Sequence, residues 1–465
     1  MTSKTFANYL YSDRYTTSGW HEQNEYHTHV SKKMEKLHAA SMLVGQPASL
    51  CTQLLARVIQ PLPGEDKDHY LKGMGIRIGA FALFLISIPF GICSFLISFS
   101  LQVIDHRDRP AISYLKTLGV QEKSLEELLM SKDNPLHIRT HNAGFVPTAV
   151  STVGDLRHPT TRAQELAKSV LNDPDQPDLI FMNEMFHEEA SKIFIEEVKS
   201  AYPHIVHNIA PSITGFSSGV VVLSKYPIET IEFMRLDHML GPERLSPRGI
   251  LCVKIHNIFL YNVHMQALFG EGRAKARLKQ LKDIKTFMET HKQSPQVLLG
   301  DFNTSQVTAW GESNNNQADN VVLTELNQNF NDLFLKDHDE IGQRKKGTTR
   351  QYPDHLPEPR GSWYHGPFAQ KGHILSLKMW LDRYFNHRSK PEQIVSVSQP
   401  TWGTPSWQSD QTANTARFDY IVLPKYQTLL DGCVEIRRVA VAQNAQSAPT
   451  DHLPVDARIW LHQQK

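Results

Sequence analysis

From Leu136 to the C-terminus, short apolar runs alternate with stretches of helical periodicity. Apolar residues at 278, 281, 284 and 288 repeat at the spacing of one helix face. Runs rich in β-branched residues predict strands at Leu136–Thr140, Leu179–Met182, Gly219–Leu223, Gly249–Ile255, Ile258–Val263, Val297–Leu299 and Phe418–Leu423. The fourth and fifth runs are separated by His256 and Asn257, which indicates a hairpin. Strands alternating with helices predict an α/β domain with mixed sheets over residues 136–465.

A much longer apolar run precedes this domain. No charged residue occurs from Ile78 to Ile104. A helix that crosses a membrane needs about 20 consecutive apolar residues, whereas a helix on a soluble surface keeps one polar face. The sequence therefore predicts a membrane segment at 76–105. Pro89, at its midpoint, is compatible with a kinked span or with the tip of a hairpin, and basic residues on both flanks slightly favour the hairpin.

The regions around the membrane segment differ in composition. Residues 1–75 are polar and predict one amphipathic helix, from Ser31 to Ile59, with no apolar signal-peptide core at the start. Residues 106–135 predict a helical linker. An insertion at 336–400 is dense in Pro, Gly, His and aromatic residues. A lid, a lipid-contacting surface and a packed insertion all remain open for it.

Charge and cysteine usage narrow the functional class. The formal net charge is +1, so the composition carries no electrostatic footprint for nucleic acid, and we expect no nucleic-acid partner. The four cysteines form no CxxC pair, which argues against a disulfide framework or a structural zinc site. The domain after the membrane segment is therefore expected in a reducing compartment.

Polar motifs end several of the apolar runs. They are Asn142 in THNAGF, Glu184 in IFMNEMF, His264 in YNVHMQA, Asp301 and Asn303 in LLGDFNT, Asp419 in ARFDYIVLP, and Asp451 with His452 in APTDHLPV. Strand ends at one sheet edge bring such residues together. Carboxylate and carboxamide oxygens suit Mg²⁺, and an imidazole oriented by a carboxylate can serve as a general base. These residue types predict metal-assisted hydrolysis of a phosphate ester.

The six motifs, taken in this order, resemble those of the endonuclease/exonuclease/phosphatase superfamily over about Leu136 to Trp460. The resemblance implies a four-layer α/β sandwich, two central mixed sheets flanked by helices, preceded here by the membrane segment. It also implies a metal site formed by Glu184, Asn142 and Asp451.

The resemblance further assigns the catalytic set. Asp301 and Asn303 are similar to the pair that positions water and phosphate, and His264 to the histidine that contacts the phosphate. His452 resembles the general base, with Asp419 as its orienting carboxylate.

Three local segments are similar to the neutral sphingomyelinase branch: NVHMQA, SSGVVVLSKYPI, and PTWGTPSW ahead of ARFDYIV. Gly403 departs from that branch, whose members often carry an acidic residue there. A membrane tether also raises the effective concentration of a lipid substrate. The resemblance implies a membrane-anchored phosphodiesterase of the phospholipase C type, dependent on Mg²⁺ or alternatively Mn²⁺, with sphingomyelin as its substrate. A phosphoinositide phosphatase or nuclease of the same fold, and a catalytically silent membrane scaffold, remain as alternatives. No protein partner can be inferred.

Overall fold

The structure is a computed structural model, and it describes residues 14–18, 32–59, 67–106, 112–124, 135–153, 157–212, 216–267, 271–304, 314–333, 419–426, 430–436, 452 and 454–461. The predicted insertion at 336–400 and the predicted metal ligand Asp451 lie outside these residues.

Two mixed sheets form the centre of the molecule. The first has the strand order β1-β7-β8-β9-β10-β12-β11. Its strands are β1 (Arg14–Ser18), β7 (Thr230–Arg235), β8 (Gly249–Ile255), β9 (Ile258–His264), β10 (Gln296–Asp301), β11 (Phe330–Asp332) and β12 (Asp419–Pro424). The second has the order β13-β14-β3-β4-β6-β5-β2. Its strands are β2 (Ser113–Lys116), β3 (Leu136–Asn142), β4 (Leu179–Asn183), β5 (His204–His207), β6 (Val221–Ser224), β13 (Leu430–Ile436) and β14 (Val455–Leu461).

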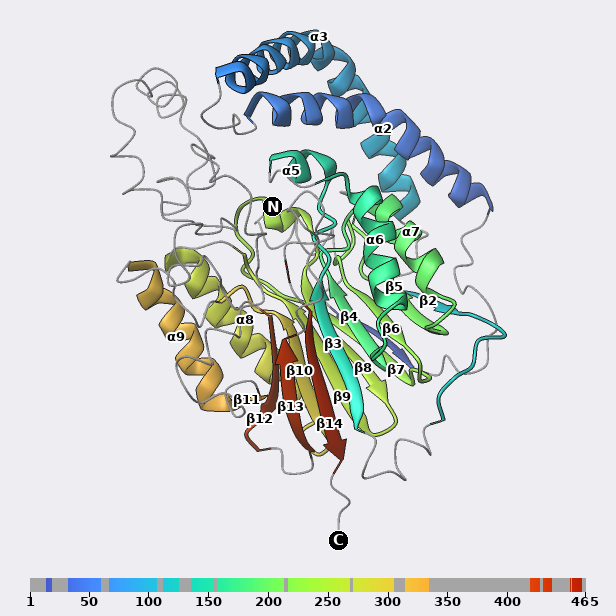
Figure 1. The fold of residues 1–465 in the computed structure, drawn as a ribbon, viewed down its shortest axis with the longest axis vertical. Coiled ribbons are helices and arrows are strands. Elements are labelled where there is room, and N and C mark those ends of the chain that lie inside the picture. The colour runs from blue at the N-terminus through green and yellow to red at the C-terminus, as the bar shows by residue number, and fades with distance from the viewer. Residues whose placement is uncertain are drawn as a thin grey trace.

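Helices cover the outer face of each sheet, which gives four layers (Figure 1). Helices α6 (Pro159–Leu171) and α7 (Glu188–Val198) pack on the second sheet, and α8 (Glu271–Glu289) and α9 (Asn314–Asn329) on the first. Strand β4 shows why its apolar run is continuous: Phe181 faces the core between the sheets, and Ile180 faces the helices. A strand buried on both faces needs apolar residues at every position. The predicted four-layer α/β fold is confirmed.

Several predicted elements coincide closely with the structure. Strand β8 has the predicted bounds, and the hairpin to β9 turns at His256, whose φ is 54°. The predicted helix from Ser31 is α2 (Lys32–Ile59).

Other elements differ from expectation. Arg14–Ser18, within the region expected to be a polar segment, adds an antiparallel edge strand to β7. Ser113–Lys116, within the expected helical linker, is strand β2 paired with β5, because Tyr114 and Leu115 bury against the second sheet. Both segments are short, and their apolar and polar residues alternate too little to predict a strand from the sequence alone.

The apolar run forms part of one long helix, α3 (Lys67–His106). The helix continues through Pro89, so the chain does not reverse there, and the expected hairpin tip at Pro89 is wrong. Within the described residues, one helix is long and apolar enough to cross a membrane, over Leu71–Leu101. Helices α2 and α3 pack together at one end of the sandwich, where α2 also contacts α5 (Thr148–Val153) (Figure 1).

Candidate active site

Strand pairing brings the predicted polar residues to one edge of the sandwich. Parallel pairing sets Asn142 of β3 opposite Asn183 of β4, and His264 of β9 opposite Asp301 of β10. Strand β12 runs antiparallel to β10 and begins at this edge, with Asp419 opposite Asp301. Because the carboxyl ends of parallel strands meet at one edge, residues far apart in sequence become neighbours.

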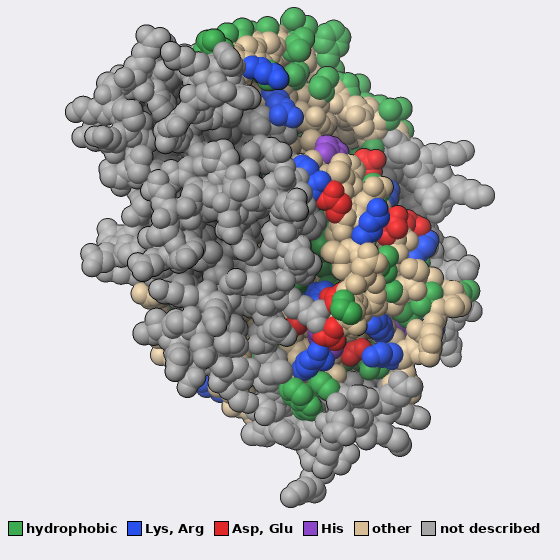
Figure 2. Space-filling model, in the orientation of Figure 1, with side chains coloured by type: hydrophobic (Ala, Val, Ile, Leu, Met, Phe, Trp, Pro, Cys, Tyr) green, Lys and Arg blue, Asp and Glu red, His purple; other side chains and the backbone are tan. Residues whose placement is uncertain are grey.

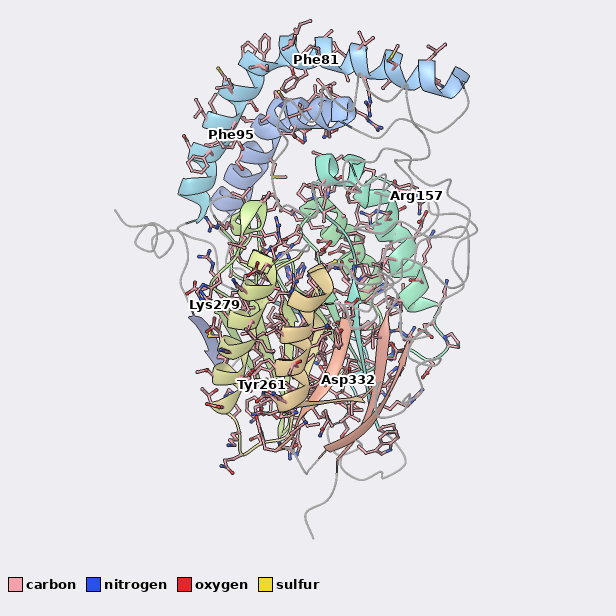
Figure 3. All side chains as sticks on the ribbon, turned by 90° about the vertical axis from the view of Figure 1, so that its left-hand side faces the viewer. Phe81, Phe95, Arg157, Tyr261, Lys279 and Asp332 are labelled. Atoms are coloured by element: carbon pink, nitrogen blue, oxygen red, sulfur yellow. The ribbon has the colours of Figure 1, made fainter. Side chains whose placement is uncertain are left out.

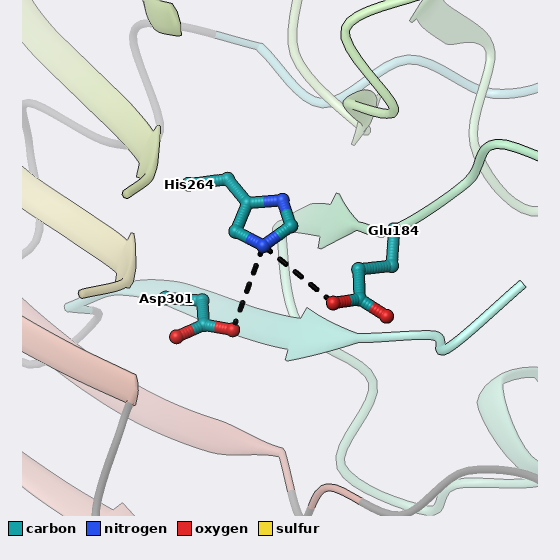
Figure 4. Close-up of side chains that lie close together, drawn as sticks. All are labelled: Glu184, His264 and Asp301. Atoms are coloured by element: carbon teal, nitrogen blue, oxygen red, sulfur yellow. Dashed lines mark ion pairs between the residues drawn. The ribbon is translucent and has the colours of Figure 1, made fainter. Parts of the chain in front are cut away.

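Glu184, His264 and Asp301 form the first cluster at this edge (Figure 4). The Nε2 atom of His264 lies 3.5 Å from Oε1 of Glu184 and 3.9 Å from Oδ2 of Asp301. The side chains of His264 and Asp301 are buried, whereas that of Glu184 is 16% exposed. The cluster is therefore enclosed on the side of the sheets and reaches solvent at the glutamate.

Burial shifts the pKa values of both enclosed side chains, Asp301 and His264. Burial and the nearby charge of Asp419 raise the pKa of Asp301 to about 7. Burial, and then the positive charge of Arg248, hold the pKa of the His264 imidazole well below its usual range. Neither ring nitrogen of His264 has a hydrogen-bond partner among the described residues. A neutral buried imidazole of this kind is suited to bind a cation or to donate to an incoming anion.

The donor set fits a hard divalent cation. Glu184, His264 and Asp301 each offer one ligand atom, and these atoms lie within 4.8 Å of one another. Asp301, Asp419 and His452 form a second group of the same kind. Carboxylates buried at such short range repel each other, and a cation between them would remove that cost. Each group offers two carboxylates, which suit a hard cation, and one imidazole, which suits borderline metals such as Zn²⁺.

His452 and Asp419 form a dyad beside the cluster. The Nδ1 atom of His452 lies 2.7 Å from Oδ2 of Asp419, and both residues are buried. The carboxylate accepts a hydrogen bond from Nδ1–H, which leaves Nε2 as the basic nitrogen. On the other side, Nε2 of His141 donates to the carbonyl of His452 at 3.1 Å. Burial lowers the pKa of His141 to about 4, so its ring is a neutral donor.

The two predicted asparagines both orient Asp301. The backbone N–H of Asn303 donates to Oδ1 of Asp301 at 2.8 Å, and Nδ2 of Asn142 donates to Oδ2 at 3.0 Å. The carboxamide oxygen of Asn142 accepts from the N–H of Gly144 at 2.9 Å. Asn142 thus lies at the site as expected, in a position where it holds the aspartate. Its role as a metal ligand stays a prediction.

Two residues of the site have left-handed backbone conformations. The φ angle is 58° at Glu184 and 51° at Asn303. This region is uncommon for residues other than glycine. At both positions it turns the chain out of a strand as soon as the edge is reached. Non-glycine residues in such conformations cluster at functional sites.

A buried amide pair joins the two sheets directly beneath the cluster. Nδ2 of Asn262, on β9, donates to Oδ1 of Asn183, on β4, at 2.9 Å, and a longer contact of 3.5 Å returns from Nδ2 of Asn183. Neither side chain is exposed. Asn183 precedes Glu184, and Asn262 lies two residues before His264. The pair therefore fixes the spacing between the strands that carry the cluster.

Replacing Asn183 and Asn262 with alanine, singly and together, should reveal this coupling. Each single variant leaves one buried amide unpaired, which costs about 1–3 kcal/mol of unfolding free energy. The double variant should lose less than the sum, by more than about 0.5 kcal/mol. Urea unfolding measures these values. Additive losses would show that the two amides act independently.

Arg248 is a further residue at this edge that the sequence did not reveal. Its Nη1 donates to the carbonyl of Met265 at 3.2 Å and lies 3.5 Å from Oε2 of Glu243. Its guanidinium lies over the ring of Phe186, 5.6 Å from the centroid, and Phe186 in turn neighbours His264. Arg248 precedes an apolar strand in the segment SPRGI, and nothing in that pattern distinguishes it from an ordinary strand-end arginine.

Comparison with known proteins agrees with the order of the motifs. A family model described as the Endonuclease/Exonuclease/phosphatase family matches residues 140–452. Sphingomyelinase C 1 of Leptospira interrogans is 27% identical over 198 residues, which cover 37% of this chain and 33% of that protein. Sphingomyelinase C of Bacillus cereus is 25% identical over 272 residues, covering 53% of this chain and 76% of the relative.

The chain thus spans only about a third of the length of the Leptospira protein. Among solved structures, sphingomyelinase C from Streptomyces griseocarneus is similar with a TM-score of 0.43 and 14% identity, covering 70% of this chain and 99% of that chain.

Proposed function

Because the chain belongs to the endonuclease/exonuclease/phosphatase family, we propose that it is a phosphodiesterase of the phospholipase C type. In this proposal the enzyme is anchored in a membrane, depends on Mg²⁺, and hydrolyses sphingomyelin to ceramide and phosphocholine. One observation carries the proposal. The dyad of His452 and Asp419, which can accept a proton, adjoins Glu184 and Asp301, whose carboxylates can hold a cation, and His264 lies against both carboxylates.

Each part of the site has a role in this reaction. Mg²⁺, when bound by Glu184 with Asp301, supplies positive charge that offsets the charge developing on the phosphate. His452 accepts the proton of the attacking water at Nε2, and Asp419 stabilises the imidazolium that forms. His264, neutral and enclosed, offers a ring N–H to a phosphate oxygen. Asn303 keeps Asp301 oriented through its backbone N–H.

Three observations support a lipid substrate. Segments such as NVHMQA are similar to the sphingomyelinase branch, and the matching relatives include sphingomyelinases of Leptospira interrogans and Bacillus cereus. Helix α3 is long and apolar enough to serve as an anchor. The pair of α2 and α3 also lies at the same end of the sandwich as the site, because α2 contacts α5, which follows closely after Asn142 (Figure 1).

A substrate panel with and without a chelator tests the proposal. The full chain is purified in detergent and assayed with Mg²⁺. The substrates are sphingomyelin, phosphatidylcholine or phosphoinositides in mixed micelles, and plasmid DNA in the same buffer. Phosphatidylcholine is the matched control, because it shares the head group and differs in the lipid backbone. We expect phosphocholine release from sphingomyelin, abolished by the chelator and restored by added Mg²⁺. Cleavage of DNA alone would overturn the lipid assignment.

The raised pKa of Asp301 predicts a pH-dependent stability in the absence of metal. The folded protein keeps a proton on Asp301 up to a pKa of about 7, whereas the unfolded chain releases it near the ordinary value of 3.8. Unfolding therefore releases a proton within this window, so the contribution of Asp301 to stability falls as the pH rises. In the presence of a chelator, the melting temperature of the wild type minus that of Asp301→Asn should fall by several degrees between pH 5 and pH 8. A constant difference would refute the raised pKa.

A further inference from the structure

Helices α2 and α3 form an antiparallel pair (Figures 1 and 3). Near the start of α2, the hydroxyl of Ser98 donates to the carbonyl of Ser41 at 2.9 Å. Farther along α2, Cys51 lies against Gly91, where an added Cβ would be 3.0 Å from the Cβ of Cys51. The start of α2 therefore lies beside the end of α3, and contact covers the stretch of α3 from Gly91 to Ser98.

A proline in α2 is accommodated by a side chain of α3. Pro47 lies inside α2 and has no backbone N–H. In a regular helix the N–H of Ala48 would pair with the carbonyl of Val44. Here the hydroxyl of Ser94 lies between them: it donates to the carbonyl of Val44 and accepts from the N–H of Ala48 at 3.2 Å. Ser94 is only 6% exposed. Where water is absent, a backbone N–H or carbonyl without a partner in its own helix needs another hydrogen-bonding group, such as a hydroxyl of a neighbouring helix.

The contact surface is built from small residues. Ser41, Gly45 and Ala48 of α2 lie on it, and a Cβ added at Gly45 would be 3.0 Å from the hydroxyl oxygen of Ser98. Small residues spaced three or four apart let helix backbones approach closely, as in membrane helix pairs. Residues 39–56 of α2 also carry no charged side chain, although among the described helices only α3 is apolar enough to cross a membrane by itself. At about 1.5 Å per residue this stretch is about 27 Å long, close to the hydrocarbon thickness of about 30 Å.

Elsewhere along its uncharged run, α3 exposes many apolar side chains. Its most exposed apolar side chains include Phe90 at 69%, Ile86 at 67% and Ile78 at 61%. Phe81 and Phe95 point away from the pair at separate places along α3 (Figure 3). Hydrophobic side chains gather over α3 at the end of the molecule (Figure 2). A helix without a polar face needs an apolar environment around it.

We propose that α2 and α3 enter the bilayer together as a helical hairpin, so that the segment before α2 and the domain after α3 lie on the same side of the membrane. The inference rests on the membrane anchoring included in the proposed function. It follows from the contacts: α2 packs on Gly91, Ser94 and Ser98, which lie within the uncharged run of α3. If that run is in hydrocarbon, the part of α2 in contact with it is in hydrocarbon too. A single span would require α2 to leave α3 and expose Ser94 and Ser98.

Protease protection of the full chain in sealed vesicles tests the topology. The chain carries one epitope before α2 and another at its C-terminus, and the vesicles are washed with alkaline carbonate before protease is added outside. We expect the protein to stay with the membrane and both epitopes to be cleaved together or protected together. Opposite fates would overturn the hairpin while leaving the anchoring intact. Release by carbonate would refute the anchoring itself, and the hairpin with it.

A disulfide across the pair tests the packing in the membrane. Gly91→Cys, in a Cys93→Ser background, places a thiol next to Cys51. The Cβ separation of 3.0 Å is shorter than the usual range of about 3.5–4.5 Å, so a shift of a few tenths of an ångström accompanies the bond. The matched control is Gly79→Cys in the same background, because Gly79 has no neighbouring atom within 4 Å of an added Cβ. Mild oxidation of membranes should join peptides from α2 and α3 in the first variant only, as seen by mass spectrometry. Equal joining in both variants, or none in either, would contradict the pairing.

Discussion

Replacing His452 with alanine should lower kcat by about 10³-fold, because the variant loses the group that accepts a proton from water. Asp419→Asn should lower kcat by at least about 10²-fold, since the amide no longer holds the Nδ1 proton or stabilises the imidazolium. Steady-state phosphocholine release from sphingomyelin measures both. Circular dichroism should show that the fold persists.

A matched control and a rescue separate catalysis from folding. His291 stacks on Phe259 and contacts Tyr261 away from the strand ends that form the site, so His291→Ala should retain activity. Added imidazole should restore part of the activity of His452→Ala and none of that of Asp301→Asn. Near-normal turnover by His452→Ala would show that another group is the base.

Glu184→Gln should reduce activity by orders of magnitude at a Mg²⁺ concentration that saturates the wild type. The amide keeps the size of the side chain but removes the charge that a hard cation requires. Activity should return in part at much higher Mg²⁺, so the activation curve shifts to the right. Mg²⁺ titration of activity, with direct binding by calorimetry, measures the shift.

The control for this variant is Glu188→Gln in the first turn of α7. Glu188 is a nearby acid that pairs with Lys192 at 2.8 Å and lies outside the cluster. Its replacement should leave the Mg²⁺ curve unchanged. Identical curves for the wild type and Glu184→Gln would remove Glu184 from the metal site.

The strands that carry the site could be predicted because their signal is local. β4 and β10 are buried on both faces and are therefore continuous apolar runs, each ending in a polar residue such as Glu184 or Asp301. The order of these endings then suggested one shared edge, and the strand register confirms it. The family resemblance implies the pairing of His452 with Asp419, and Nδ1 of the histidine lies 2.7 Å from Oδ2 of the aspartate.

Other supporting groups could not be predicted, because their partners lie on distant parts of the chain. Asn183 and Asn262 were visible in their motifs, yet only the distance between the sheets pairs them. His141 precedes Asn142, and its bond to the carbonyl of His452 joins residues that lie far apart in the sequence. The close approach of β9 to β10 also requires Gly300, whose φ is 126° and whose added Cβ would be 2.2 Å from the carbonyl oxygen of Val263.

The left-handed conformations at Glu184 and Asn303 have a consequence for the engineering of this protein. Glycine would adopt either conformation with less strain, worth on the order of 1 kcal/mol per position. A laboratory selection for heat resistance alone would therefore favour glycine at 184 and 303. The change at 184 would remove the carboxylate of the cation cluster, and the change at 303 would remove the side-chain amide that donates to the carbonyl of Met265 at 3.1 Å. Libraries intended to make the protein more robust should hold these two codons fixed and seek their improvements elsewhere.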